Sequence, residues 1–135
     1  ITSGSVRCWG INLVGELGDG TLEYRYSPVT MLGITDAVDV VAFNGGTCVL
    51  RSTGTVRCTG SNSELTLGSG IENETITTAR EVPGLTNVTA LLAGSTHVCA
   101  MRTGGALWCW GRNREGQLGR PPSDPQFPAA ALGFS

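Results

Sequence analysis

The stretch Gly4-Ser5-Val6-Arg7-Cys8-Trp9-Gly10 opens a pattern that occurs three times in this chain of 135 residues. Its further copies are Gly54-Thr55-Val56-Arg57-Cys58-Thr59-Gly60 and Gly105-Ala106-Leu107-Trp108-Cys109-Trp110-Gly111. An asparagine follows each copy, at Asn12, Asn62 and Asn113, and a Leu-Gly pair follows each asparagine, at Leu17-Gly18, Leu67-Gly68 and Leu118-Gly119. Self-similarity at a period of about fifty residues predicts a repeat architecture, in which each unit buries its apolar face by stacking on its neighbours.

The residues between the copies predict strands. Thr47-Cys48-Val49-Leu50 and Val98-Cys99-Ala100-Met101 each lead through a Gly-containing turn into the next copy, which is typical of a β-hairpin. A further β-rich run precedes each hairpin, and the 20 glycines suit tight turns rather than long helices. We therefore predict an all-β chain with approximate units 1–33, 34–84 and 85–135, in which a complete unit resembles a four-stranded propeller blade.

The combined motifs resemble the repeat of the RCC1 family. Residues 6–12 with 15–21 carry the resemblance in the first unit, and residues 93–101 with 109–113 and 116–119 carry it in the third. The resemblance implies a partial β-propeller of the RCC1 type, with about two and a half four-stranded blades in this chain. The middle unit departs from the pattern, so we expect rebuilt loops there; the departures are Phe43-Asn44-Gly45-Gly46, Thr59, Leu65 and Ser69.

The number of units is smaller than a closed ring requires. A propeller closes so that no blade leaves an edge strand open to pairing. We expect the chain to be a piece of a longer protein, and the alternative is self-association of several copies through open blade edges.

The cysteines follow the repeat. Cys48 and Cys58 lie on the two arms of one predicted hairpin, and Cys99 and Cys109 lie on the arms of the next, each pair with the turn midway between them. Facing residues of an antiparallel pair come close enough for a disulfide, so we expect both bridges, with Cys8 unpaired in this segment. The alternative is five buried free thiols in a cytosolic propeller.

Disulfides would place the protein in an oxidising, extracytoplasmic compartment, which means periplasmic, cell-surface or secreted. Two sequons, at Asn73 and Asn87, are candidate glycosylation sites only in a eukaryotic secretory pathway. No run of the sequence has the apolar length of a transmembrane helix, so we expect no direct membrane span in this segment.

Charge and composition exclude several classes of function. The net charge is −2 and 15% of residues are charged. The chain therefore lacks the excess of basic residues that is typical of a nucleic-acid-binding protein. All nine basic residues are arginine, so Schiff-base chemistry and a phosphate-binding P-loop lysine are absent from this segment.

The sequence contains no recognisable set of catalytic residues, and we expect no cofactor and no metal. His97, the only histidine, occupies a repeat position and is expected to bond a nearby backbone group. Zinc binding by His97 with Cys99 and Cys109 is disfavoured because no Cys-x-x-Cys pair is present. The tryptophans are expected to pack in the core; they are Trp9, Trp108 and Trp110.

Variable loops follow the Leu-Gly pairs at 21–27, 71–80 and 120–128, and repetition places them on one rim of the propeller. The candidate partner-binding residues in these loops are Tyr24, Arg25, Tyr26, Arg120 and Phe127. Arg25 has an alternative role, which is to brace adjacent blades.

These observations favour a non-enzymatic protein–protein interaction scaffold outside the cytoplasm. It would act as an accessory subunit, an inhibitor or a receptor ectodomain. The alternatives are a guanine-nucleotide exchange regulator of a small GTPase, which would need reduced thiols, and a carbohydrate-binding surface protein.

Overall fold

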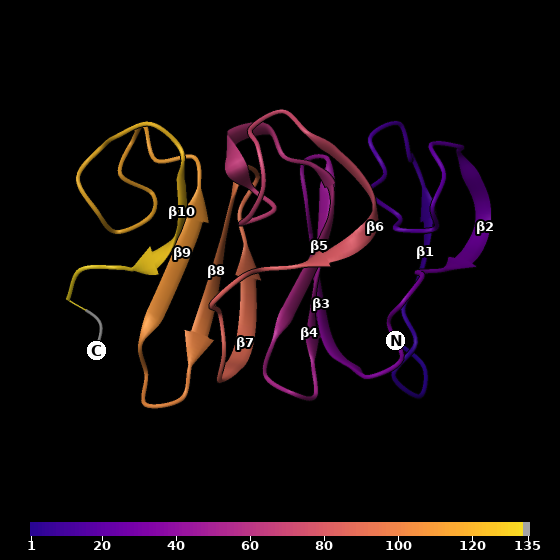
Figure 1. The fold of residues 1–135 in the computed structure, drawn as a ribbon, viewed down its shortest axis with the longest axis horizontal. Coiled ribbons are helices and arrows are strands. Elements are labelled where there is room, and N and C mark those ends of the chain that lie inside the picture. The colour runs from indigo at the N-terminus through magenta and orange to yellow at the C-terminus, as the bar shows by residue number, and fades with distance from the viewer. Residues whose placement is uncertain (134–135) are drawn as a thin grey trace.

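The fold consists of three antiparallel sheets that stand side by side along the chain (Figure 1). A computed structural model describes residues 1–133. The first sheet contains β1 (Arg7–Gly10) and β2 (Arg25–Thr30). The second contains β3 (Ala37–Phe43), β4 (Gly46–Arg51), β5 (Val56–Ser61) and β6 (Thr75–Glu81). The third contains β7 (Val88–Ala93), β8 (His97–Arg102), β9 (Leu107–Gly111) and β10 (Gln126–Ala130).

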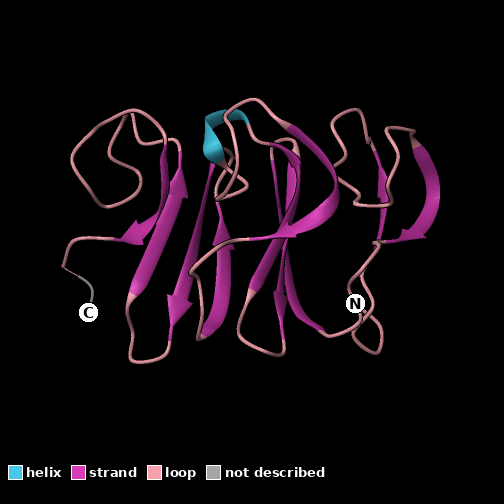
Figure 2. Cartoon of the chain, viewed as in Figure 1, coloured by secondary structure: helices cyan, strands magenta, loops and turns pink. Residues whose placement is uncertain are grey.

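The second and third sheets are meanders, with strand orders β3-β4-β5-β6 and β7-β8-β9-β10. Within residues 1–133 the one helix is a 3₁₀ turn at Ser63–Leu65, drawn in cyan in Figure 2. No helix in this range is long and apolar enough to span a bilayer. The prediction of an all-β chain is confirmed.

Each four-stranded sheet has a disulfide across its central hairpin. Cys48 lies opposite Cys58, and Cys99 lies opposite Cys109; in both pairs the Cα atoms are 4.1 Å apart and the sulfurs are bonded. These are the pairs that the symmetric turn positions predict. Cys8 on β1 is a free thiol.

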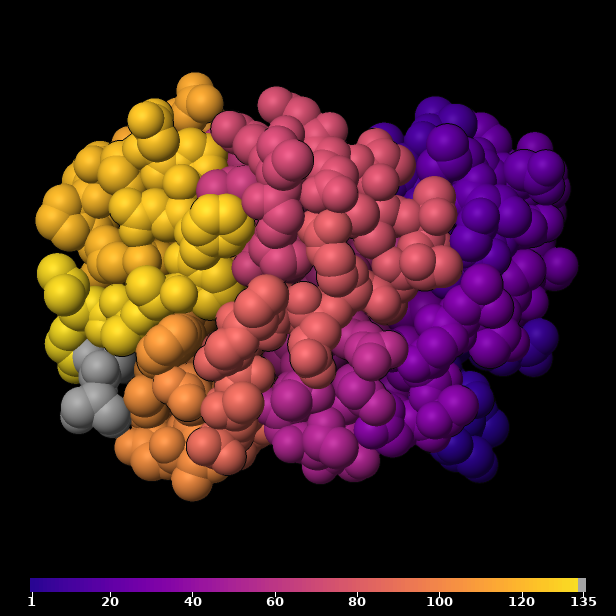
Figure 3. Space-filling model, in the orientation of Figure 1, coloured from indigo at the N-terminus to yellow at the C-terminus, as the bar shows by residue number. Residues whose placement is uncertain are grey.

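The core lies between the sheets rather than within any one of them. Leu50, Val56 and Val82 of the second sheet unit pack against Leu91 and Val98 of the third in one buried cluster. A second cluster joins the first unit to the second through Val6, Met31, Ile34, Ala37 and Val49. The space-filling view shows the three units in continuous contact (Figure 3). Burial between units is the stacking that repeat architectures need.

The loops predicted after the Leu-Gly pairs, 21–27, 71–80 and 120–128, are shorter in the structure. Much of the range 71–80 folds as β6, and β2 and β10 take parts of the other two ranges. The β-branched run Thr75-Ile76-Thr77-Thr78 favours the strand. The outer strand of each sheet therefore anchors the far end of its rim loop.

The expectation that all three tryptophans pack in the core is wrong for Trp9. Trp110 is fully buried, whereas Trp9 is 63% exposed. Trp110 reaches back to the preceding unit, where its indole nitrogen donates to the carbonyl oxygen of Thr66. Thr59, at the same repeat position, likewise donates to Gly15 in the unit before it. Trp9 belongs to the first unit, and residues 1–133 hold no earlier unit for its indole to contact.

Candidate functional site

The rim loops all lie at the same end of the sheets, the upper edge in Figure 1, and each is built around a buried asparagine. The side-chain oxygen of Asn12 accepts a hydrogen bond from the backbone N–H of Leu17 at 3.0 Å, and its amide nitrogen donates to the carbonyl oxygen of Thr21 at 2.9 Å. Asn62 and Asn113 repeat the arrangement, accepting from Leu67 and Leu118. The asparagine thus closes each loop from within, which explains the fixed spacing between it and the Leu-Gly pair.

The first rim loop is braced further by a buried carboxylate. Asp19 accepts hydrogen bonds from Asn12, Thr21 and Arg25, and the Arg25 Nε–Asp19 Oδ2 distance is 2.7 Å. Burial alone would raise the pKa of Asp19, but these hydrogen bonds outweigh it and lower the pKa to about 2. Arg25 Nη1 also lies 3.6 Å from Glu23 Oε2. Its partners all belong to its own unit, so Arg25 braces its own loop, and the alternative role of bracing an adjacent blade is wrong.

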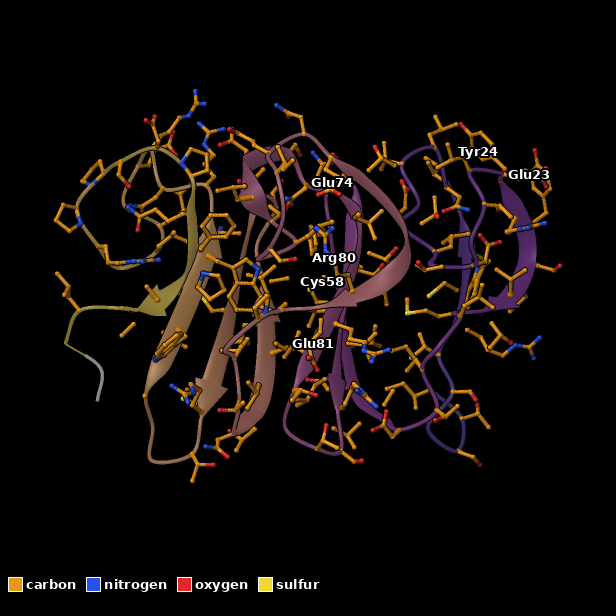
Figure 4. All side chains as sticks on the ribbon, in the orientation of Figure 1. Glu23, Tyr24, Cys58, Glu74, Arg80 and Glu81 are labelled. Carbon is orange, nitrogen blue, oxygen red and sulfur yellow. A yellow bond between two sulfur atoms is a disulfide. The ribbon has the colours of Figure 1, made fainter. Side chains whose placement is uncertain are left out.

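Arg25 separates two tyrosines that point to solvent. Tyr24 is 47% exposed and Tyr26 is 95% exposed. Leu22 in the same loop is also exposed. Figure 4 shows Tyr24 and Glu23 at the rim end of β2. A rigid loop therefore presents an exposed apolar and aromatic surface, which we call the tyrosine loop (residues 21–27).

The second rim loop uses different residues for the same brace. Ser69 replaces the aspartate, and Arg80 from β6 donates to the Ser69 hydroxyl at 3.0 Å and to both oxygens of Glu74 (Figure 4). The hydrogen bonds from Arg80 lower the pKa of Glu74, so this carboxylate is paired with the guanidinium. Leu65 holds a left-handed backbone with φ of 55° where the other units have glycine, and the short helix lies there. The loop is rebuilt, as expected for the middle unit.

The third rim loop buries part of its arginine. Arg120 Nη2 donates to the carbonyl oxygen of Cys109 at 2.7 Å, and burial lowers the pKa of its guanidinium. The structure therefore gives Arg120, a candidate partner-binding residue, a role inside its own unit. Phe127 lies on β10 and is half exposed.

The structure also places the residues weighed for chemistry. Within residues 1–133 the His97 ring makes no hydrogen bond to the backbone, contrary to expectation. It packs against Gly94, where a Cβ atom would collide with the ring. In the same range no group of three or more His, Cys, Asp or Glu side chains is arranged to hold a metal ion. Asn73 and Asn87, the two sequon asparagines, are exposed and lie in left-handed turns.

The family comparison matches the C-terminal part of the chain. Two models described as the Regulator of chromosome condensation (RCC1) repeat match residues 88–117 and 104–131. These ranges cover the third sheet and its rim loop. They include the Cys-Trp-Gly and Leu-Gly motifs on which the resemblance rests.

Solved structures match nearly the whole chain. Prp20p from Saccharomyces cerevisiae, described with its binding to Gsp1p and histones, has a TM-score of 0.84 at 16% identity over 94% of this chain. Human WBSCR16 has a TM-score of 0.81 at 20% identity over 96% of this chain. Yeast RCC1 (Prp20) bound to Kap60 has a TM-score of 0.79 at 19% identity over 94%. These TM-scores confirm an RCC1-type propeller fold. The chain spans 34%, 33% and 31% of the three proteins respectively, so it forms part of such a propeller.

Proposed function

The chain carries RCC1 repeats in a segment of a propeller, and from that premise we propose that it is a non-enzymatic scaffold that binds a protein partner through its rim loops. The observation that carries the proposal is the contrast within the tyrosine loop. Its polar groups are satisfied internally by Asn12, Asp19 and Arg25, while Tyr24 and Tyr26 face solvent.

This contrast suits recognition for a physical reason. Aromatic side chains on a braced loop lose little conformational entropy on binding, and tyrosine is enriched among the residues that dominate interface energies. The exposed apolar side chains at the rim extend beyond this loop to Leu13, Ile71 and Phe127. Apolar groups at one edge of a rigid repeat scaffold are typical of a protein-binding surface.

The two disulfides support a place of action outside the cytoplasm. Each joins facing residues of a hairpin, and cytosolic reductants would keep such thiols reduced. The finer roles that fit this setting are an accessory subunit, an inhibitor or a receptor ectodomain.

Photo-crosslinking tests the proposal. The photoreactive amino acid p-benzoylphenylalanine would replace Tyr26 in the protein expressed in its own cells, and a matched control would carry it at Thr53, an exposed residue in the β4–β5 turn at the opposite end of the sheets. We expect position 26 to crosslink one defined protein and position 53 to crosslink none. Equal crosslinking from both positions, or none from position 26, would contradict a rim-loop interface.

A second arm measures affinity once the partner is identified. Tyr26→Ser should weaken binding by roughly tenfold or more, as expected for an interface hot spot, and leave the melting temperature unchanged because the side chain is exposed. A weakening that comes only with loss of stability would argue for a structural role instead.

The second candidate function is nucleotide exchange on a small GTPase. The fold similarity to Prp20p, described with Gsp1p binding, is the observation that favours it. Release of a fluorescent GDP analogue from a panel of small GTPases, with the protein kept reduced, discriminates the two. Acceleration would support exchange activity, and its absence would support the scaffold.

A further inference from the structure

The outer edge of the second sheet is uncovered. β6 is the last strand in the order β3-β4-β5-β6, and within residues 1–133 it pairs with β5 alone. The second sheet has a neighbouring sheet on each side, so β6 has the surroundings that an outer strand has within a propeller. Figure 3 shows the salmon-coloured atoms of β6 at the surface, between the first unit and the third. An edge strand in this position can pair with a further chain unless something blocks it.

The alternation of hydrogen bonds shows which groups of β6 face this edge. The N–H of Val82 donates to the carbonyl oxygen of Val56 at 2.9 Å, so these residues form a hydrogen-bonded pair. Bonded and non-bonded pairs alternate along an antiparallel ladder, so in the next pair, Arg57 and Glu81, the backbone groups of Glu81 point away from β5. The backbone groups of Ala79 point away from β5 for the same reason. Within residues 1–133 the backbones of Ala79 and Glu81 form no hydrogen bond outside their own sheet.

Proline occupies one of these two positions in the other outer strands. The three strands align on the residue that pairs with the cysteine of the repeated motif, and the residue before it is Pro28 in β2, Ala79 in β6 and Pro128 in β10. Proline has no N–H, and on an edge strand it protects against pairing with another chain. Two prolines at this position also indicate that it donates nothing to the ladder inside the sheet. Among the three outer strands, β6 is therefore the one that keeps an outward N–H donor here.

The unblocked part of the edge is short. At its upper end, the N–H of Gly20 in the first unit donates to the carbonyl oxygen of Thr77 at 2.9 Å. At its lower end, Pro83 follows Val82. We call residues 78–82 the open edge. A strand that docks there has to pair with Ala79 and Glu81, which together offer two N–H and two carbonyl groups.

The open edge carries an unpaired negative charge. The side chain of Glu81 is exposed and lies at the other end of β6 from Glu74 (Figure 4). Within residues 1–133 Glu81 forms no ion pair, and Arg57 opposite it on β5 donates to the carbonyl oxygen of Gly33 at 3.3 Å. Arg80, between the two outward positions, is already paired with Glu74. A strand beside β6 is therefore favoured if it places a basic residue opposite Glu81.

We propose that the open edge of β6 docks an extended segment of a partner protein, which adds an antiparallel strand to the second sheet and places a lysine or arginine opposite Glu81. Main-chain hydrogen bonds to Ala79 and Glu81 supply the pairing, and the charge of Glu81 selects the segment. This surface lies on the outer side of the sheet and not on the rim loops, so the proposal does not depend on the rim-loop interface.

A second copy of this chain does not fit the open edge. A symmetric antiparallel pairing centred on Arg80 places two arginines directly opposite each other, and one centred on Glu81 does the same with two carboxylates. Like charges in these positions are destabilising. A pairing centred on Ala79 would need the backbone of Thr77, whose carbonyl oxygen already accepts from Gly20. The occupant is therefore a different protein.

Crosslinking with a proline variant tests the proposal. The photoreactive amino acid p-benzoylphenylalanine replaces Thr78, which is exposed on the open edge, in the protein expressed in its own cells. Ala79→Pro blocks the edge, and Pro28 and Pro128 show that the fold accepts proline at this position, so the melting temperature should not change. We expect one defined crosslinked protein, and a yield that falls at least about tenfold with Ala79→Pro.

No crosslink from position 78, or an equal yield with Ala79→Pro, would overturn the proposal. Position 26 reports on the rim loops and is read separately. A crosslink from position 78 that Ala79→Pro removes, with none from position 26, would support the open edge and contradict the rim-loop interface.

A peptide titration tests the charge preference and does not rely on the proline variant. The probe is the synthetic peptide acetyl-Thr-Val-Lys-Val-Thr-amide, and the control has glutamate in place of the lysine. NMR amide signals of the protein report where each peptide binds. We expect the signals of Ala79 and Glu81 to move, with an affinity for the lysine peptide at least about threefold higher than for the control, and Glu81→Lys to reverse this preference.

Equal affinities for the two peptides, or signals that move only elsewhere in the chain, would overturn the proposal. Signals of Ala79 and Glu81 that move with protein concentration in the absence of peptide would also overturn it, and would identify a second copy as the occupant.

Discussion

The indole nitrogen of Trp110 donates a hydrogen bond to the carbonyl oxygen of Thr66 at 3.0 Å, and the two residues belong to neighbouring units 44 residues apart. The indole is fully buried. This contact ties the Cys-Trp-Gly motif of one unit to the Leu-Gly loop of the unit before it. The sheets are therefore joined by specific polar contacts as well as by apolar packing.

Trp110→Phe should destabilise the fold. The substitution leaves the buried carbonyl of Thr66 without its donor, which costs roughly 1–3 kcal/mol, and the smaller ring leaves a cavity that adds to the loss. Urea unfolding followed by circular dichroism measures the effect. Trp9→Phe is the matched control, and it should change stability little because Trp9 is mostly exposed.

Asn62→Ala should loosen the second rim loop. The side chain accepts from Leu67 N–H and donates to the carbonyl oxygens of Ser69 and Ile71, and all of these bonds are lost. Each buried group left unpaired costs roughly 1–3 kcal/mol. Hydrogen exchange at the Leu67 amide reports the loss locally, and unchanged protection there would count against the role assigned to Asn62.

Asn62→Asp distinguishes the hydrogen bond that the Asn62 side chain accepts from the two that it donates. The variant keeps an acceptor for Leu67 N–H but turns a carboxylate oxygen toward two carbonyl oxygens, which repel it. We expect destabilisation that lessens as the pH falls and the new carboxyl becomes protonated. A stability equal to that of the wild type at neutral pH would show that the donor half contributes nothing.

Acid should weaken the first rim loop through Asp19. The pKa of Asp19 is about 2 in the folded protein against an ordinary value of 3.8, so the folded state favours the ionised form. Its contribution to stability is therefore complete above about pH 4 and is lost as the pH falls from there towards 2. Asp36, Glu74 and Glu115 also have lowered pKa values and contribute to acid unfolding in the same direction.

The comparison with Asp19→Asn isolates the contribution of Asp19 from that of the other carboxylates. The difference in unfolding free energy between wild type and variant should be largest near neutral pH and shrink between pH 4 and pH 2. A difference that stays constant over this range would contradict the assignment of the lowered pKa to Asp19.

Removing the disulfide of the second sheet should lower the melting temperature by several degrees. The Cys48→Ala, Cys58→Ala double variant loses the bridge between two residues that lie 10 apart in the sequence. On a chain-entropy estimate this loss lowers the free energy of unfolding by roughly 2–3 kcal/mol. Differential scanning calorimetry under non-reducing conditions measures the change. Cys8→Ala serves as the control, because Cys8 has no bridge to lose within the chain.

Much of the fold could be predicted because the repeat is local. The hairpins are encoded by short apolar runs around a Gly-containing turn, and the symmetric turn places Cys48 opposite Cys58 with no knowledge of the rest of the molecule. The buried role of Asn62 was not predicted, although its fixed distance to Leu67 was visible in the sequence. Three regular spacings are a signal that the side chain closes a loop onto the backbone.

Other features could not be predicted because they depend on the neighbour and not on the residue. Trp9 and Trp110 lie in the same motif, yet one is exposed and the other is buried, because burial requires the preceding unit. The brace between Arg80 and Glu74 depends on how β6 folds back over its loop, and the polar sequence 71–80 hides a strand whose signal is only its β-branched residues. The role of Arg25 was predicted wrongly for a different reason: its partner Asp19 lies six residues earlier in the same loop, and only the fold of that loop brings the two side chains together.

Disulfide mapping of the oxidised chain tests the central claim most directly. The claim is that consecutive propeller sheets are each closed by a bridge across the central hairpin. Digestion under non-reducing conditions, after alkylation of the denatured protein, should yield linked peptides for Cys48–Cys58 and Cys99–Cys109 and one alkylated thiol at Cys8. Five alkylated cysteines, or a bridge between the two hairpins, would contradict it.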